Sequence, residues 1–244
     1  MWNSFSERDL ALLKPEELEE ALQLLEEMER LALENRIDSF YPDHGPLRRE
    51  LYPRHLEFFA AGVTHRERCF LAANRVGKTE GVGAYELTLH LTGRYPAWWN
   101  GRRFTHPVDA WAAGDTSKTV HKEILQPKLL GKPGHHGTGM LPGDSILRSV
   151  SKPGVPEAVE TVYVEHASGG ESVLTFKSYE QGRESFQGSE KHVIWLDEEC
   201  PKPIYVECLM RTMTTNGLIL LTFTPLQGMT ELIKDFLGIQ MSET

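Results

Sequence analysis

Apolar and charged positions follow a helical spacing in the first part of the chain. Leu18, Leu22 and Leu25 recur at steps of three and four between charged residues, which is the spacing of one face of a helix. Pro15 suits a first helical position, and the glutamates after it favour the positive end of the helix dipole. The pattern predicts a helical N-terminal arm over residues 1–45. Its apolar stripe packs either on its own domain or on a neighbouring subunit.

From residue 46 onward, short apolar runs alternate with longer segments of helical spacing. This alternation indicates strands joined by helices, and therefore an α/β domain with a central, mostly parallel sheet over residues 46–244. The runs that predict strands are 68–72, 108–113, 192–196 and 217–224, and the segments that predict helices are 77–91, 117–130, 204–213 and 229–237.

Two further stretches interrupt this alternation. Residues 162–165 and 172–176 flank a Ser-Gly-Gly turn, which predicts a β-hairpin. Residues 131–157 are dense in Gly, Pro, Ser and His and predict an irregular surface excursion. His135 and His136 lie in that stretch without a nearby cysteine to complete a ligand set, so we expect a solvated loop there.

Composition limits the classes of function. The chain has 244 residues with 40% apolar and 25% charged content, which is ordinary for a globular protein. It contains no apolar run of about 20 residues and no signal-peptide pattern, and its three cysteines form no CxxC pair. We therefore expect an intracellular protein without disulfides or membrane contact. The net charge of −9 does not support DNA binding by the bulk of the chain.

The segment after the first predicted strand carries the sharpest chemical signal. A phosphate-binding loop needs backbone N–H groups at a helix start, a lysine for the phosphates and a hydroxyl for Mg²⁺. Lys78 and Thr79 supply the last two, although Ala72 stands where such loops usually have their first glycine. Because a strand comes before the loop and a helix with small residues after it, we predict a nucleotide site. Its residues are Ala73, Asn74, Arg75, Val76, Gly77, Lys78 and Thr79.

Arg75 lies inside this loop and has two possible roles. An arginine at this place can reach the γ-phosphate from the same chain and stabilise the transition state as a cis arginine finger. Alternatively, it positions the phosphates or supports the loop. The sequence leaves both roles open.

A pair of acids ends the predicted strand 192–196. An apolar strand places Asp197 at its carboxyl end, where ligands bind in open α/β sheets. There Asp197 can hold Mg²⁺ directly or through water. Glu198 points differently and can polarise the attacking water, a division of labour that phosphoryl transfer requires. We therefore assign Asp197 to the metal and Glu198 to catalysis.

Two threonines end the next apolar strand. At the end of this strand, the hydroxyls of Thr222 and Thr224 can sense the γ-phosphate, and the following segment can then respond when that phosphate is lost. They can equally be β-branched residues that favour a strand. The residues alone do not decide between these interpretations.

Together these segments resemble the large terminase subunit of tailed double-stranded DNA bacteriophages, especially the headful-packaging podovirus-like branch. The resemblance spreads over residues 52–237, in the order of the family. It rests on the motifs ERCFLAANRVGKT, HLTGRYP, KSYEQGRESFQGSEKHVIWLDEE and LLTFTPLQGM.

The resemblance implies a RecA-like P-loop ATPase domain of the ASCE type, which uses ATP with Mg²⁺. It makes 73–79 the Walker A loop, Asp197 and Glu198 the Walker B pair, and Thr222 and Thr224 the coupling motif. Tyr52 and His55 would bind adenine, although His55 stands where the family often has a glutamine. Arg183 and Arg211 are candidates for an arginine presented to a neighbouring subunit, or else structural ion-pair partners.

The resemblance also implies the biological setting. It makes the chain a motor ATPase that pumps viral DNA into a procapsid, with double-stranded DNA, portal protein and small terminase subunit as partners. We expect a ring on the capsid, a monomer as an isolated domain, and action in the host cytoplasm rather than in the mature virion. The family's nuclease domain would follow residue 244, so DNA cleavage is not expected of this chain.

Two other functions remain compatible with the residues. One is a different nucleic-acid-stimulated P-loop ATPase, such as a helicase-like protein, which would need a second RecA-like domain or a hexameric ring. The other is a non-catalytic module in which bound nucleotide shapes a docking surface. The glutamate at position 198 argues against the second.

Overall fold

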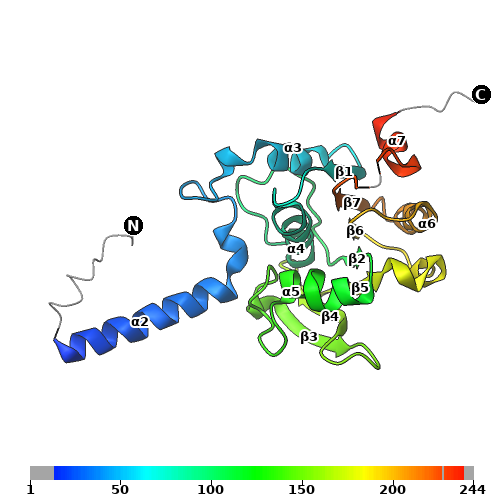
Figure 1. Ribbon diagram of the computed structural model, residues 1–244. Coiled ribbons are helices and arrows are strands. Elements are labelled where there is room, and N and C mark those ends of the chain that lie inside the picture. Colours follow the sequence, from blue (N-terminus) through cyan, green and yellow to red (C-terminus); the bar gives the residue numbers. More distant parts are fainter. Residues whose placement is uncertain (1–13, 227, 239–244) are drawn as a thin grey trace, which may run out of the picture.

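A seven-stranded sheet forms the centre of the molecule (Figure 1). The computed structural model describes residues 14–226 and 228–238. The strand order is β1-β7-β6-β2-β5-β4-β3, with parallel pairing from β1 to β5 and antiparallel pairing among β5, β4 and β3. This confirms the predicted α/β class with a mostly parallel sheet. The strands are β1 Glu67–Leu71, β2 Asp109–Gly114, β3 Ile146–Ser151, β4 Val159–Glu165, β5 Glu171–Ser178, β6 Val193–Asp197 and β7 Leu218–Phe223.

Helices cover both faces of this sheet. Two apolar clusters form the core, one on each face, and the helices contribute to them as separate layers. One face carries α3 Pro53–Ala61, α4 Tyr85–Thr92 and α5 Leu125–Leu130, and the other carries α6 Lys202–Thr212 and α7 Glu231–Leu237. Shorter helical segments are η1 Arg36–Ser39, η2 Arg49–Leu51, η3 Lys78–Ala84, η4 Thr119–Glu123, η5 Gly143–Ser145, η6 Tyr179–Gln181 and η7 Arg183–Phe186.

The central strands read as continuous apolar runs because both of their faces are buried. On β6, Val193 and Trp195 enter one cluster, while Ile194 and Leu196 enter the other. This is the alternation expected of a strand between two helical layers. It explains why the sequence located the buried strands well.

The structure corrects the prediction for residues 131–157. That stretch contains the edge strand β3, which pairs with β4, and it buries Met140 and Leu141 completely in the core. Five of the six β3 residues are exposed, so the strand shows no apolar alternation. Its backbone pairing with β4 and the ion pair of Arg148 with Glu171 fix its position, and the abundance of Gly and Pro around it masked the signal.

The helix predicted over 117–130 is divided in two. The first part, η4, ends before Ile124, and α5 starts again at Leu125. Pro127 explains the break, because its ring lacks a backbone N–H and clashes with the carbonyl four residues earlier. Within the first turn of a new helix, the same residue is tolerated.

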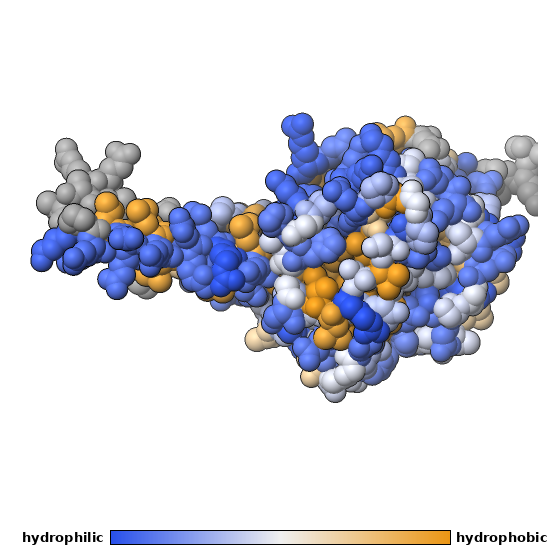
Figure 2. All heavy atoms as spheres, turned by 90° about the horizontal axis from the view of Figure 1, so that it is seen from below, coloured by the Kyte–Doolittle hydropathy of each residue, from blue (hydrophilic) through white to orange (hydrophobic). Residues whose placement is uncertain are grey.

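A helix forms within the predicted N-terminal arm, of which residues 1–13 lie outside the described residues, but its apolar stripe is not docked on the rest of the chain. The helix is α2, Pro15–Glu34, and it projects away from the body of the molecule (Figures 1 and 2). Six apolar side chains on it are 36–56% exposed: Leu22, Leu24, Leu25, Met28, Leu31 and Leu33. The packing of this stripe on its own domain is therefore wrong for this structure. Within the described ranges, no helix is both long and apolar enough to cross a bilayer.

Candidate active site

The loop after β1 has the backbone shape of a phosphate site. Arg75 and Gly77 adopt left-handed conformations, with φ of 65° and 83°. Alternating backbone conformations of this kind turn successive N–H groups toward one concavity, which attracts anions. Helix η3 begins directly afterwards at Lys78, so its free N–H groups face the same place.

The two functional side chains of the loop lie beside the end of β6. Lys78 is nearly buried, at 7% exposure, and its ammonium donates to the Ala73 carbonyl across 3.2 Å. The hydroxyl of Thr79 donates to Oδ1 of Asp197 across 3.1 Å. The structure thus brings the predicted loop and the predicted strand-end acid together.

The acid pair differs in environment. Burial raises the pKa of Asp197 to about 7, and the hydroxyls of Thr222 and Thr79 oppose that rise. Glu198 is half-buried, and its pKa is also raised by burial, with Lys78 acting in the opposite direction. Glu198 has a φ of 64°, a left-handed conformation that costs free energy for a side chain other than glycine. Because of this turn, the side chains of Glu198 and Asp197 leave the backbone in different directions.

These groups fit a magnesium ion. Mg²⁺ prefers hard oxygen ligands and usually binds one or two carboxylates together with substrate phosphates and water. Thr79 and Asp197 offer a hydroxyl and a carboxylate beside the phosphate loop. A nearby cation would also offset the cost of a buried carboxylate, which now shows in the raised pKa of Asp197.

The two candidate coupling threonines both touch the site. Thr222 donates to Oδ1 of Asp197 across 2.7 Å. The hydroxyl of Thr224 lies 3.0 Å from the Ala72 carbonyl and 2.9 Å from the amide oxygen of Asn74. Because β7 lies between β1 and β6, its end connects the phosphate loop with the acid pair.

A cavity of about 780 Å³ opens beside the loop, and Tyr52 and His55 both line it. His55 is buried with both ring nitrogens engaged. Its Nε2 lies 3.1 Å from the Val76 carbonyl and its Nδ1 lies 2.7 Å from the hydroxyl of Tyr41. His55 therefore has no free ring nitrogen for a base in this arrangement, whereas Tyr52 remains available on the cavity wall.

The three candidate arginines lie in different settings. Arg75 is exposed and lines the same cavity, and no hydrogen bond or ion pair fixes its side chain within the described part of the chain. Arg183 and Arg211 instead share the buried carboxylate of Glu207, each at 3.1 Å. In this structure both act as ion-pair partners, and a role toward a neighbouring subunit stays a prediction.

Sequence reasoning missed three aromatic residues that hold this site. Tyr41 reaches both His55 and the Gly81 carbonyl. The hydroxyl of Tyr179 donates to the Asp197 carbonyl across 2.9 Å. Trp195 shares a strand face with Asp197, and that spacing of two was the one signal available in the sequence.

The chain shows clear similarity to known proteins. Residues 69–240 match the family model described as terminase large subunit, T4likevirus-type, N-terminal. The large terminase subunit of Salmonella phage P22 is 38% identical over 245 residues, an alignment that covers 92% of this chain. A solved large terminase of a thermophilic bacteriophage in complex with ADP has a TM-score of 0.45 at 13% identity, covering 70% of this chain and 38% of that chain.

The extent of these matches defines what they establish. The chain spans about half of its phage P22 relative, 47% of that protein's length. The family match covers well over half of the present chain and includes the loop, both acids and both threonines of the site. The chain therefore belongs to the large terminase subunit family, in the region that corresponds to that family's N-terminal part.

Proposed function

We propose that this chain is an ATPase that uses Mg²⁺, and that its turnover drives double-stranded viral DNA into a procapsid. The observation that carries the proposal is the junction at Asp197, on whose carboxylate the hydroxyls of Thr79 and Thr222 converge. That junction lies at the phosphate loop and at the end of β7, so it joins nucleotide to a strand that can transmit a change.

The residues divide the chemistry among them. Lys78 and the loop N–H groups bind and orient the phosphates, and Thr79 and Asp197 would hold Mg²⁺, which supplies charge neutralisation. The raised pKa of Glu198 suits a group that accepts a proton from the attacking water. Arg75 faces the cavity from the same loop, in place to stabilise the transferred phosphoryl group as a cis finger. Tyr52 would stack on the base.

The biological setting is part of the same proposal. Membership of the large terminase family supports partners that this family works with, namely DNA, a portal protein and a small terminase subunit. We infer a ring of copies on the capsid that acts in the host cytoplasm. The net charge of −9 places DNA contact on local basic patches or on other parts of the assembly.

Two substitutions test the catalytic core. In Lys78→Ala, ATP binding or turnover should be abolished, whereas Lys118→Ala on the exposed surface should behave as wild type. In Glu198→Gln, ATP should bind but stay unhydrolysed. Glu157→Gln is the matched control, because Glu157 is an exposed glutamate with a similar φ of 61°. Binding is measured by calorimetry and turnover by phosphate release, with and without double-stranded DNA.

The outcomes separate the candidate functions. Wild-type turnover in Lys78→Ala would remove the phosphate-loop assignment. Tight binding without hydrolysis in the wild-type chain, at saturating Mg²⁺ and DNA, would favour a nucleotide-dependent docking module instead. Hydrolysis stimulated equally by single-stranded DNA would favour a helicase-like enzyme.

A further inference from the structure

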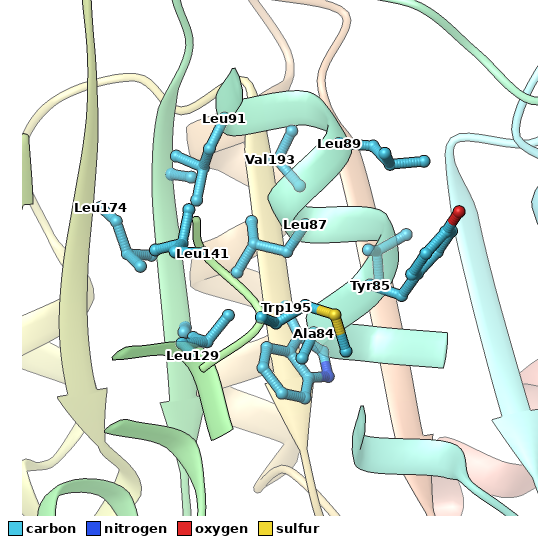
Figure 3. Close-up of a cluster of buried hydrophobic side chains, with 14 of the residues drawn as sticks. Ala84, Tyr85, Leu87, Leu89, Leu91, Leu129, Leu141, Leu174, Val193 and Trp195 are labelled. Carbon is cyan, nitrogen blue, oxygen red and sulfur yellow. The ribbon is translucent and has the colours of Figure 1, made fainter. Parts of the chain in front are cut away.

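Trp195 occupies a special place on the strand that carries the acid pair. Side chains two apart on a strand project from the same face, so Trp195 and Asp197 point the same way from β6. Figure 3 shows the indole below the start of α4, next to Ala84. The side chain is completely buried.

The helix after the phosphate loop is shaped around this ring. A Cβ atom on Gly83 would lie 2.2 Å from both Cε2 and Nε1 of Trp195. No carbon atom can approach an aromatic ring so closely, so a side chain at position 83 would displace either the indole or η3. The absence of a side chain there brings η3 and β6 together at the indole nitrogen.

The indole nitrogen starts a directed chain of hydrogen bonds. Its N–H donates to the hydroxyl oxygen of Thr222 across 2.8 Å. An indole N–H is a donor only, so the hydroxyl must accept at this contact and is left with its one proton to give elsewhere. That proton goes to Oδ1 of Asp197, 2.7 Å away. Strand pairing places Asp197 directly opposite Thr222, which fixes the geometry.

We propose that Trp195 is a positioning residue of the metal site. By occupying the acceptor side of the Thr222 hydroxyl, its N–H forces the hydroxyl proton toward Asp197 and fixes the carboxylate at the angle from which it meets Thr79. The inference rests on the proposed function, because it assigns Asp197 to Mg²⁺. It adds a residue behind Thr222 that sets how well the metal is held.

Ordinary core packing is the competing explanation for a buried tryptophan. Under that explanation the ring fills space and its N–H merely finds a partner, as buried indoles usually do. Trp99 is such a case, because it is also buried and its Nε1 donates to the Arg102 carbonyl across 3.0 Å. Trp99→Phe is therefore the matched control, since it removes an indole N–H bond outside the acid site.

The test measures metal binding rather than turnover. Mn²⁺ serves as the paramagnetic probe in place of Mg²⁺, and its binding to the chain with saturating ADP is followed by electron paramagnetic resonance. Residues that orient a metal ligand typically change metal affinity about 10–100-fold when substituted. We expect Trp195→Phe to weaken Mn²⁺ binding about tenfold, near the lower end of that range. ADP binding without metal should stay within about twofold, because the N–H acts through Asp197 and not through the phosphate loop.

A double substitution identifies the route. If the indole acts through Thr222, then Trp195→Phe combined with Thr222→Val should bind Mn²⁺ no worse than Thr222→Val alone. Thr222→Ser keeps the hydroxyl and should retain most of the affinity. Replacing the indole of Trp195 by benzothiophene, an isostere with sulfur in place of N–H, repeats the test without a change of shape if Trp195→Phe does not fold.

Each result decides a separate question. Unchanged Mn²⁺ affinity in Trp195→Phe or in its benzothiophene isostere, with a wild-type chain that binds ADP and Mn²⁺, overturns only the role of Trp195. Additive losses in the double substitution also overturn it, because they show an effect that bypasses Thr222. A wild-type chain that binds neither ADP nor Mn²⁺ overturns the proposed function itself.

Discussion

The hydroxyl of Tyr41 lies 2.7 Å from Nδ1 of His55 and also donates to the Gly81 carbonyl across 2.6 Å. The opposite nitrogen of His55 lies 3.1 Å from the Val76 carbonyl. Two side chains from the segment before β1 therefore contact the backbone of the phosphate loop at Val76 and that of η3 at Gly81. Tyr41 reaches this place through a left-handed backbone conformation, with a φ of 56°. We infer that this segment supports the loop rather than only covering it.

Tyr41→Phe tests that support. The substitution keeps the ring, which packs among several aromatic neighbours, and removes the hydroxyl from a buried site. Leaving buried partners without a hydrogen bond costs roughly 1–3 kcal/mol. We expect a loss of that size in the free energy of unfolding, measured with urea, together with weaker ADP binding.

The control is Tyr85→Phe in the same aromatic cluster. Tyr85 is buried, but its hydroxyl makes no hydrogen bond to any described residue. Its removal should change stability by less than about 0.5 kcal/mol. Equal behaviour of the two variants, or a Tyr41→Phe protein with normal ADP affinity, would contradict the role of Tyr41 in the loop.

His55 predicts a specific dependence on pH. Burial lowers the pKa of His55, and the Val76 carbonyl opposes this only partly. Because the folded-state pKa lies below the unfolded value of about 6.5, the stability from neutral His55 is complete above that pH and is lost as the pH falls through it toward the folded pKa. Relative to His55→Gln, the wild-type chain should therefore lose stability between about pH 7.5 and 5.5.

A gain of stability on acidification would point to the hydrogen bonds of His55. Three contacts join Val76, His55, Tyr41 and Gly81, but a neutral imidazole and one hydroxyl carry only two protons between them. An imidazolium would supply the third proton. If the wild-type chain gains stability relative to His55→Gln on acidification, then hydrogen bonding outweighs burial at this site. Urea unfolding at both pH values distinguishes the two cases.

The sheet, the phosphate loop and the acid pair could be predicted from the sequence because all three leave local signals. A strand buried on both faces is a continuous apolar run, and β6 and β7 were recognised in that way. The loop and acid pair follow directly from those runs. By contrast, β3 is an exposed edge strand, and its position depends on the backbone of β4.

Most of the residues that support the site could not be predicted from the sequence pattern around them. Tyr41 lies 40 positions from its partner Gly81, and nothing near it in the chain indicates that contact. Arg211 and Glu207 lie four positions apart on α6, a spacing that the sequence does show, but Arg183 lies 24 positions from Glu207 and no local pattern marks that pair. Such contacts arise only after the chain has folded.

Asp197→Asn should stabilise the chain while it removes function. Burial raises the pKa of Asp197 to about 7, so at pH 8 the folded state holds an ionised carboxylate at a cost. A neutral amide of the same shape removes that cost, and we expect a gain on the order of a few kcal/mol in the free energy of unfolding without nucleotide or metal. Mn²⁺ binding with ADP should be lost. A destabilised variant would show that the hydroxyls of Thr222 and Thr79 outweigh burial, and Asp115→Asn, at an exposed position, serves as the control.

Removal of α2 tests whether the arm belongs to the folding unit. Eight glutamates and one arginine give Pro15–Glu34 a charge of −7, most of the net −9 of the chain, and six of its apolar side chains are exposed. Burial of apolar area is the main source of stability, so an undocked helix contributes little. For a chain that begins at residue 35, the free energy of unfolding in urea should stay within about 1 kcal/mol of that of the full-length protein, since surface changes of this kind have small effects.

A loss of stability well beyond that would show that the stripe packs on its own domain in solution, which is the first of the two interpretations of the sequence. Unchanged stability, with an apparent mass in light scattering that falls from that of several copies to that of one, would instead show that the stripe joins one copy to another.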